Sequence, residues 1–403
     1  MTVTSSPPSE PDAWEALRRS EFPGAHINLN AGTLGTTARS ARAAQRGFWR
    51  GGLRAWPLGQ YTRGRADLLR VRAVVAELWG PTPVAVTAGT SETMTRITLA
   101  LHARLGPGPI RVLTSGHEHA GGLAGFLGIP GVSVHYLPDH ALADPDALTE
   151  IVAAVRPHVL FLSQVTYTTG QRVPVERHIA VARAVERELW TIVDAAQALG
   201  LVAPSLVGAD LVVASGHKWL FGPPGCGLLW MSARARDQLV AGAAGEPLDA
   251  AAPCAGFERT GGHDLSVYAG LAAALELHAR LGPAAVQARS TALAGWFADE
   301  LHTRLRDRTV AHAFVDPNTG ELTDRPAPAG DLVGAVHVHF PDRDPYPAYA
   351  SLDRRGIHLK CIKTTRPTGA RLAVLRVCVP CYESHARLRG ALDSIADSLA
   401  RRP

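Results

Sequence analysis

Lysine is nearly absent from this 403-residue chain: Lys218, Lys360 and Lys363 stand against 38 arginines. The arginines are spread along the whole chain, with no basic run and no basic–aromatic stripe. The formal net charge of +5 therefore does not indicate a nucleic-acid surface. Arginine stays charged and is a poor amine nucleophile, so it cannot replace a lysine in amine chemistry. A lysine within a distinctive motif is for this reason easy to single out.

Cysteines and long apolar runs are also scarce. The five cysteines are too few and too scattered for a disulfide framework. No uninterrupted apolar stretch reaches the roughly 18 residues that a membrane helix needs. Residues 1–12 are rich in serine and proline and lack the apolar core of a secretory signal, so we expect a flexible leader. These absences favour a cytoplasmic protein without a membrane partner.

The remaining composition is that of a globular protein with 46% hydrophobic and 19% charged residues, long enough for a large and a small domain. From residue 84, short apolar runs alternate with helical stretches such as Glu92–Leu105 and Val175–Glu188, which predicts an α/β fold with a mostly parallel sheet. The runs are Val84–Thr87, Arg111–Thr114, Val132–Leu137, Val159–Ser163, Thr191–Asp194, Leu211–Ala214 and Gly227–Met231.

The pattern changes near residue 264. Two long Ala/Leu helices, at about 265–281 and 284–307, precede the turn-rich segment Val315–Asp331. Two strands and two helices then alternate to the end of the chain. We therefore expect residues 13–263 to form an N-terminal segment and a large domain, and residues 264–403 to form a smaller α+β domain.

Lys218 lies in Ser215-Gly216-His217-Lys218, which follows an apolar run, and Asp194 ends the apolar run before it. This arrangement is how proteins hold pyridoxal 5′-phosphate. The lysine forms a Schiff base with the aldehyde, and the aspartate keeps the pyridine nitrogen protonated. In parallel sheets, ligands gather at the carboxyl ends of strands, where both residues are expected.

Two further motifs follow predicted strands. Thr90 and Ser91 open a helix after small residues, where backbone N–H groups and hydroxyls can meet a phosphate. His119 follows the Arg111–Thr114 run, where an imidazole can lie on the pyridine ring and exchange protons with a substrate. The segment Ser163-Gln164, with Thr168-Thr169-Gly170 after it, is expected at the same edge, either near the ligand or as a polar turn.

Together these residues resemble the class V aminotransferase family of pyridoxal-phosphate enzymes, of fold type I. The family includes cysteine desulfurases, C–S lyases, aminotransferases and isopenicillin N epimerase, and the resemblance runs from Leu29-Asn30 to Tyr382. It implies a seven-stranded sheet in the large domain, no metal, and the following cofactor contacts: Asp194 on the pyridine nitrogen, Gln197 on the ring hydroxyl, His119 stacked on the ring, and Thr90, Ser91, Ser215 and His217 on the phosphate.

The same resemblance assigns the substrate side. Leu375-Arg376-Val377-Cys378 matches a family strand whose arginine clamps the α-carboxylate of the substrate. Asn30, Gly32 and Thr33 are implied as neighbouring substrate-binding residues. The segment around Gly262 resembles a loop that reaches the phosphate of the neighbouring subunit, which implies a homodimer with shared active sites.

The chain departs from the family pattern at several positions. Gly262 and His263 replace a threonine and an arginine, so a hydroxyl contact across the dimer is in doubt, whereas a backbone N–H contact is still possible. A Cys-Val-Pro-Cys sequence, Cys378 to Cys381, replaces a serine and a histidine. A redox role is disfavoured because the first cysteine lies within a strand rather than at a helix start. Cys361 has the spacing of a desulfurase cysteine, but its loop is too short, which favours coincidence.

His119 directs the choice of reaction. Aminotransferases of the family tend to stack a tryptophan on the cofactor ring, whereas its desulfurases and C–S lyases use histidine. We therefore expect action at Cα and Cβ through an external aldimine, with Lys218 as base, in a C–S β-lyase that cleaves a cysteine S-conjugate in secondary metabolism. Epimerisation, transamination and oxidative deamination stay open.

Two classes of non-enzyme are less consistent with the sequence. No Gly-x-Gly-x-x-Gly follows the first strand, which disfavours a dinucleotide-binding domain. A cofactor-free scaffold would be expected to lose Lys218 or Asp194, and both are present.

Overall fold

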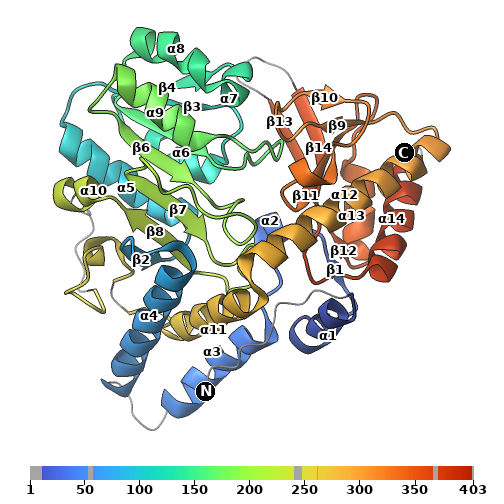
Figure 1. Ribbon diagram of the computed structural model, residues 1–403, viewed down its shortest axis with the longest axis horizontal. Helices are drawn as coiled ribbons and strands as arrows, with labels where there is room; N and C mark the ends of the chain where they lie inside the picture. Colours follow the sequence, from blue (N-terminus) through green and yellow to red (C-terminus); the bar gives the residue numbers. More distant parts are fainter. Residues whose placement is uncertain (1–10, 53–57, 240–246, 261, 366–370, 402–403) are drawn as a thin grey trace.

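The computed structural model of the chain describes residues 11–52, 58–239, 247–260, 262–365 and 371–401 (Figure 1). The longer helices are α1 (Pro11–Glu21), α3 (Arg39–Gly52), α4 (Leu58–Trp79), α5 (Thr90–Leu105), α6 (Ala120–Leu127), α8 (Leu148–Val155), α9 (Val175–Val185), α11 (Ser266–Leu281), α12 (Pro283–Asp307), α13 (Tyr346–Arg354) and α14 (His385–Ala400). Shorter helices are α2 (Ala31–Leu34), α7 (His140–Ala143) and α10 (Ala233–Gln238).

The larger sheet has seven strands in the order β2-β8-β7-β6-β5-β3-β4. Only β8 runs against its neighbours; the other six strands share one direction, and their carboxyl ends lie at one edge. The mostly parallel sheet expected from the sequence is thus confirmed. The strands are β2 (Val84–Thr87), β3 (Ile110–Ser115), β4 (Val132–Leu137), β5 (Val159–Ser163), β6 (Trp190–Asp194), β7 (Leu211–Ser215) and β8 (Gly227–Met231).

Both faces of this sheet are covered by helices. The central strands β5 to β8 are buried at every residue, which explains why they appear in the sequence as continuous apolar runs. Val212 and Ala214 pack with α4, α8, α9 and α11, whereas Leu211 and Val213 pack with α5, α6 and α10. Alternate residues of one strand therefore serve two separate layers of the core.

A second, antiparallel sheet has the order β10-β9-β11-β14-β13, with α12, α13 and α14 packed against it (Figure 1). Its strands are β9 (Ala313–Val315), β10 (Leu322–Thr323), β11 (Ala335–His339), β13 (Lys360–Thr365) and β14 (Arg371–Cys378). A separate parallel pair joins β1 (Ile27–Asn28) to β12 (Ile357–His358). This pair ties the segment before α2 to the segment between α13 and β13, and the sequence patterns did not predict it.

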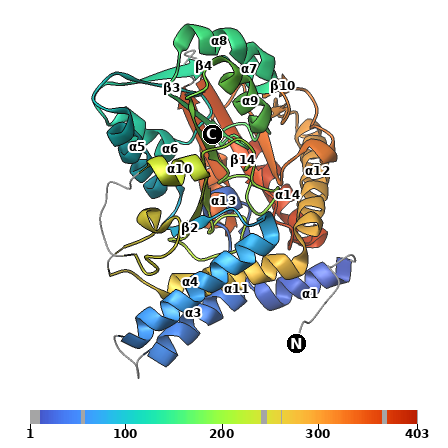
Figure 2. The same ribbon diagram turned by 60° about the vertical axis from the view of Figure 1, so that its left-hand side comes forward.

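The long helices after residue 264 divide between the two cores. Gly282 ends α11 with a φ of 77°, and Pro283 begins α12, the usual residues at such a junction. α11 packs beside α3 and α4 in the core of the larger sheet (Figure 2), whereas α12 packs in the core of the smaller one. A boundary drawn from these cores falls near residue 282 rather than 264. The division into domains itself stays a prediction.

The predicted leader lies mostly outside the described residues, which begin at Pro11; that residue and Asp12 already belong to α1. No described helix is long and apolar enough to cross a membrane. The turn-rich segment Val315–Asp331 contains the short strand β10.

Candidate active site

A cavity of about 360 Å³ opens where the carboxyl ends of the larger sheet meet the smaller sheet. The sequence placed most of the candidate residues at this edge, and the fold brings them together there. The cavity is lined by Gly32, Thr33, Ala88, Gly89, Thr90, Ser91, Glu92, His119, Gly122, Tyr167, Asp194, Ala196, Ser215, His217, Lys218 and Lys360.

One end of the cavity is built to hold an anion. Gly89 has a φ of 143°, which is costly for other residues, and it precedes α5 without a side-chain cap of its own. The N–H of Thr90 donates to Ser215 Oγ at 3.4 Å. The hydroxyls of Thr90 and Ser215 lie 2.8 Å apart beside this helix start. His217 Nδ1 is buried without a hydrogen-bond partner among the described residues. Such a set of open donors suits a phosphate.

Asp194 and Lys218 form the centre of the site. Asp194 is 5% exposed, its Oδ1 accepts the N–H of Ala196 at 2.7 Å, and burial raises the pKa of its carboxyl although Lys218 opposes the change. Burial lowers the pKa of Lys218 to about 8, against a smaller opposing effect of Asp194. A larger share of the Lys218 amine is therefore uncharged near neutral pH than for an exposed lysine, and a nucleophile or base must be uncharged.

The position of Lys218 depends on a close approach of the N-terminal segment. Gly35 donates its N–H to the carbonyl of His217 at 2.8 Å. A Cβ atom at Gly35 would stand 1.9 Å from the carbonyl oxygen of Lys218, so only glycine fits there.

His119 caps the start of α6. Its Nδ1 accepts the N–H of Gly121 at 3.0 Å, which places the proton of the neutral ring on Nε2. Burial, followed by the charges of Lys218, Arg376 and Lys360, lowers the pKa of His119. The ring is therefore a neutral imidazole with an N–H available to a ligand in the cavity.

Glu118, beside His119, is buried beneath the site. Its carboxyl accepts the hydroxyl of Ser115 at 2.6 Å and the N–H of Ser163 at 3.0 Å, and it also bonds the Ser163 hydroxyl. Burial raises the pKa of Glu118 to about 7, and Asp194 adds to the effect. Glu118 thus ties the His119 loop to the end of β5, a role that no motif in the sequence indicates.

Arg376 lies on β14 and is 1% exposed; it is not among the residues that line the cavity, but it contacts Thr33 and Tyr167, which are. Its Nη2 donates to Thr33 Oγ1 at 2.9 Å and to Asn30 Oδ1 at 3.3 Å. Its Nε and Nη1 are buried and have no partner among the described residues. A buried guanidinium with two open donors suits a carboxylate ligand.

Two further hydrogen bonds, both to the backbone of Gly32, hold the Asn30–Thr33 segment next to Arg376. Cys378 accepts the N–H of Gly32 at 3.3 Å, and Gln197 donates from Nε2 to the carbonyl of Gly32 at 2.8 Å. Gln197 also accepts from the Trp219 indole at 3.5 Å, so its amide already has protein partners. Its predicted contact with the cofactor hydroxyl stays a prediction.

Other expected residues lie elsewhere. Gly262 is exposed and is not among the residues that line the cavity, and its neighbour Gly261 lies outside the described residues. Gln164 does not reach the cavity: its amide bonds Ala203 and Ser205, while Thr168 bonds His117. The interpretation of this segment as a polar turn therefore fits these two residues.

Among the cavity residues that were missed in the sequence, Tyr167 and Lys360 have polar side chains. Tyr167 stands between those polar residues; its ring lies 5.2 Å from the Arg376 guanidinium carbon and meets His119 edge-on at 4.8 Å. Lys360 lies on β13, where it is paired with Arg376 of the neighbouring strand β14. The scarcity of lysine was the one signal that could have drawn attention to it.

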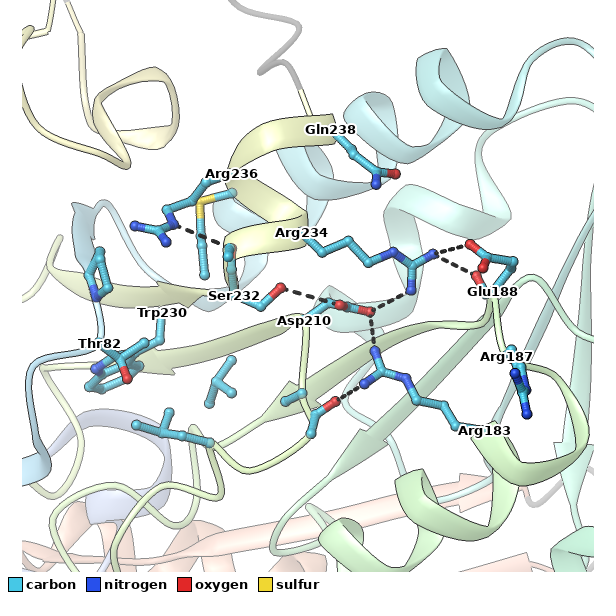
Figure 3. Close-up of a pocket in the computed structure, with 17 residues that line it drawn as sticks. Thr82, Arg183, Arg187, Glu188, Asp210, Trp230, Ser232, Arg234, Arg236 and Gln238 are labelled. Atoms are coloured by element: carbon cyan, nitrogen blue, oxygen red, sulfur yellow. Dashed lines mark hydrogen bonds and ion pairs between the residues drawn. The ribbon is translucent and has the colours of Figure 1, made fainter.

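A cavity of about 800 Å³ at the other end of the larger sheet contains more charge (Figure 3). Asp210, 2% exposed, accepts from Arg183 at 2.7 Å and from the N–H of Thr191 at 2.9 Å, and it pairs with Arg234 at 3.7 Å. Its carboxylate therefore joins α9, β6 and α10, although Arg183 Nε and Trp230 Nε1 in the same lining are buried without a partner among the described residues. This cavity lies at the amino ends of the parallel strands and has the character of a structural network.

Comparisons with known proteins agree with this assignment. The family model described as aminotransferase class-V matches residues 63–324. The chain is 28% identical to isopenicillin N epimerase of Streptomyces clavuligerus, over 95% of this chain and 98% of that one. It is 32% identical to a probable hercynylcysteine sulfoxide lyase of Mycobacterium tuberculosis, over 54% of each chain. A solved structure of a C-DES variant with glycine covalently linked to its PLP cofactor matches with a TM-score of 0.77 at 19% identity, covering 94% of this chain and 99% of that one.

The fold is that of the type I pyridoxal-phosphate transferases. The chain belongs to the aminotransferase class-V family. The cofactor of this family is pyridoxal 5′-phosphate, and the open donors beside Thr90 and His217, the buried carboxyl of Asp194 and the amine of Lys218 form a site that fits it.

Proposed function

We propose that the protein is a C–S β-lyase that acts on a cysteine S-conjugate. Thr90, Ser91, Ser215 and His217 would hold the cofactor phosphate, and Asp194 would hold the pyridine nitrogen. When bound, the cofactor supplies an electron sink for negative charge at Cα of the substrate. Arg376 binds the α-carboxylate through its two open donors, Nε and Nη1. Lys218 then removes the proton from Cα as general base.

The observation that carries the proposal is the tautomer of His119. Its Nε2 holds a proton because Nδ1 accepts the N–H of Gly121. A neutral imidazole can donate that N–H in a hydrogen bond to the sulfur atom as the Cβ–S bond breaks, and the proton that Lys218 has taken from Cα can then pass to the sulfur, so that the departing group leaves as a thiol. The remaining aminoacrylate would hydrolyse to pyruvate and ammonia. The resemblance to a sulfoxide lyase supports chemistry at this bond.

The experiment compares two leaving groups. S-(4-nitrophenyl)-L-cysteine releases a stable thiolate, whereas S-ethyl-L-cysteine needs a proton on sulfur. We expect both to give pyruvate and a thiol, and His119→Phe to slow the ethyl substrate about tenfold more than the aryl one, because the more basic sulfur depends more on the hydrogen bond from His119. Equal slowing of the two would exclude His119 as the hydrogen-bond partner of the leaving sulfur.

A second candidate is epimerisation at Cα, favoured by the match to isopenicillin N epimerase along nearly the whole chain. This reaction needs a second proton carrier besides Lys218, and His119 lines the same cavity. Exchange of the α-proton for solvent deuterium without thiol release would favour it over the lyase. Transamination would instead require an added keto acid.

We also propose a homodimer with shared active sites. Gly262 is exposed and does not line the cavity of its own chain, which is consistent with a contact to a neighbouring subunit. Sedimentation would measure the assembly. A mixture of Lys218→Ala and Gly262→Trp chains should regain part of the activity if the loop of one subunit completes the site of the other. The cytoplasmic location and the role in secondary metabolism stay predictions.

A further inference from the structure

Lys360 lies directly opposite Arg376 in the smaller sheet, on the antiparallel strands β13 and β14. Directly opposite residues point to the same face of a sheet, with Cβ atoms about 5 Å apart. Lys360 lines the cavity, and the charges of both residues lower the pKa of His119. Arg376 does not line the cavity itself, but it contacts Thr33 and Tyr167, which do, so the two cations lie beside the same site.

Such a pair is unfavourable unless an anion lies near it. Like charges directly opposite in a sheet destabilise it, and no carboxylate among the described residues forms an ion pair with Lys360 or Arg376. Glu92, the acidic residue at the cavity rim, is already paired with Arg96 at 3.7 Å. On the other flank of Arg376, His337 is kept uncharged, because burial and then Arg376 lower its pKa to about 3.

The next pair along the same face is apolar. Ile362 and Val374 lie opposite each other two residues from the cations, and Tyr167 packs against them. The face thus presents two positive charges beside an apolar wall. One cation, Arg376, is assigned to the α-carboxylate, so the other has no ligand in a substrate with a single acid group.

We propose that the substrate is an amino acid that carries a second anionic group, a carboxylate at the distal end of its side chain, and that Lys360 binds this group. The proposal rests on the proposed function, since it takes Arg376 as the binding site of the α-carboxylate. A lysine at the more open strand suits a distal group, because its ammonium stands on a flexible stem of four carbons.

The cofactor phosphate is the other anion in the site. Its donors, however, come from the start of α5 and the end of β7 on the larger sheet. Lys360 belongs to the smaller sheet, beside the residue that binds the substrate. This placement favours the substrate as the ligand of Lys360.

The test uses the loaded protein and pairs of L-amino acids that differ in a terminal carboxylate: glutamate with norvaline, and 2-aminoadipate with norleucine. Dissociation constants are measured from the change in cofactor absorption. We expect the better diacid to bind about tenfold or more tightly than its neutral partner, as one charge-assisted hydrogen bond allows. Lys360→Met should bring this ratio of dissociation constants toward one. Lys360→Glu should instead make lysine, which has a distal positive charge, bind more tightly than norleucine.

Lys363→Met is the matched control, because Lys363 lies on the same strand but pairs with Asp344 outside the cavity. It should keep the wild-type ratio. Equal binding of acids and neutral partners by the wild type would overturn the proposal and leave the proposed function intact. Weaker binding of pyridoxal phosphate by Lys360→Met would assign Lys360 to the phosphate instead. No absorption change with any amino acid would overturn the proposed function itself.

Discussion

Buried charged groups near the two ends of the larger sheet differ in how fully they are hydrogen-bonded. At the amino ends, Asp210 receives hydrogen bonds from Arg183 and from the N–H of Thr191. At the carboxyl ends, Arg376 keeps two donors without a partner among the described residues, and the charges of Lys218 and Asp194 face an open cavity. The Asp210 carboxylate is satisfied by the protein itself, although Arg183 Nε and Trp230 Nε1 nearby have no partner among the described residues, whereas the two open donors of Arg376 belong to a single guanidinium beside the candidate active site.

This difference also shows why size alone does not identify a site. The cavity at the amino ends is the larger, at about 800 Å³ against about 360 Å³. A buried polar group without a partner costs free energy, so the two open donors of the single guanidinium of Arg376, beside titratable groups with shifted pKa values, point to a ligand. The unsatisfied end is accordingly the one where substitutions should change activity more than stability.

The largest expected effect is at Lys218. Lys218→Ala removes both the amine that holds the cofactor and the base for the α-proton, so we expect turnover to fall at least about 10⁴-fold. The visible absorption of a lysine-bound cofactor should disappear as well. Lys363→Ala serves as the control, since that lysine lies outside the cavity. Normal turnover by Lys218→Ala would refute the assignment of the site.

At the opposite end, Asp210→Ala should damage the fold. It leaves Arg183 and Arg234 without the carboxylate between them, and breaking a buried ion pair in this way costs about 3–5 kcal/mol of unfolding free energy. Urea denaturation measures the loss, and the folded fraction should keep its turnover. The exposed pair of Asp146 and Arg177 offers a control, where Asp146→Ala should cost at most about 1 kcal/mol. Similar losses in the two variants would contradict the contrast between buried and exposed pairs.

Arg376→Met should give the reverse pattern. Loss of two charge-assisted hydrogen bonds to the substrate carboxylate should lower kcat/KM about 10²-fold or more. The free energy of unfolding should stay near the wild-type value or rise, because a buried charge with open donors is removed. Steady-state kinetics and urea denaturation of the same preparation measure both quantities. A large loss of stability with unchanged kcat/KM would place Arg376 with Asp210 as a structural residue.

The last prediction concerns the pH dependence of stability at Glu118, whose pKa burial raises to about 7. The folded protein then holds a proton that the unfolded chain releases above its ordinary pKa of 4.5. Stability from this group is therefore complete below pH 4.5 and is lost as the pH rises toward 7, by up to about 1.4 kcal/mol per pH unit. Glu118→Gln should remove this slope from urea denaturation measured between these pH values. An unchanged slope would show that Glu118 is already ionised when folded.

Several parts of the site could be predicted because their chemistry is local in sequence. The Ser215–Lys218 motif, Asp194 and Thr90 each directly follow a buried strand or open a helix, so an alternation of strands and helices places them at one edge. The strands β5 to β8 could also be predicted from their apolar runs, because strands buried on both faces contain few polar residues.

Other parts depend on contacts between distant segments. Tyr167 and Glu118 have no motif, and their roles arise from packing against β14 and β5. The pair of β1 and β12 joins residues about three hundred positions apart, and two-residue strands leave no periodic pattern. β1 ends at Asn28, two residues before Asn30, so the pair lies next to the segment whose Asn30 and Thr33 accept hydrogen bonds from Arg376.

The sequence by itself determined the class of protein and the cofactor, and it predicted the lysine that would hold it, since a motif beside a strand end constrains chemistry locally. Only the tertiary structure decided which charges are satisfied and which are open. The partners of Asp210, the open donors of Arg376 and the position of Lys360 depend on the register of strands that are distant in sequence. Register is set by the packing of whole sheets, and side-chain neighbours across strands follow from it.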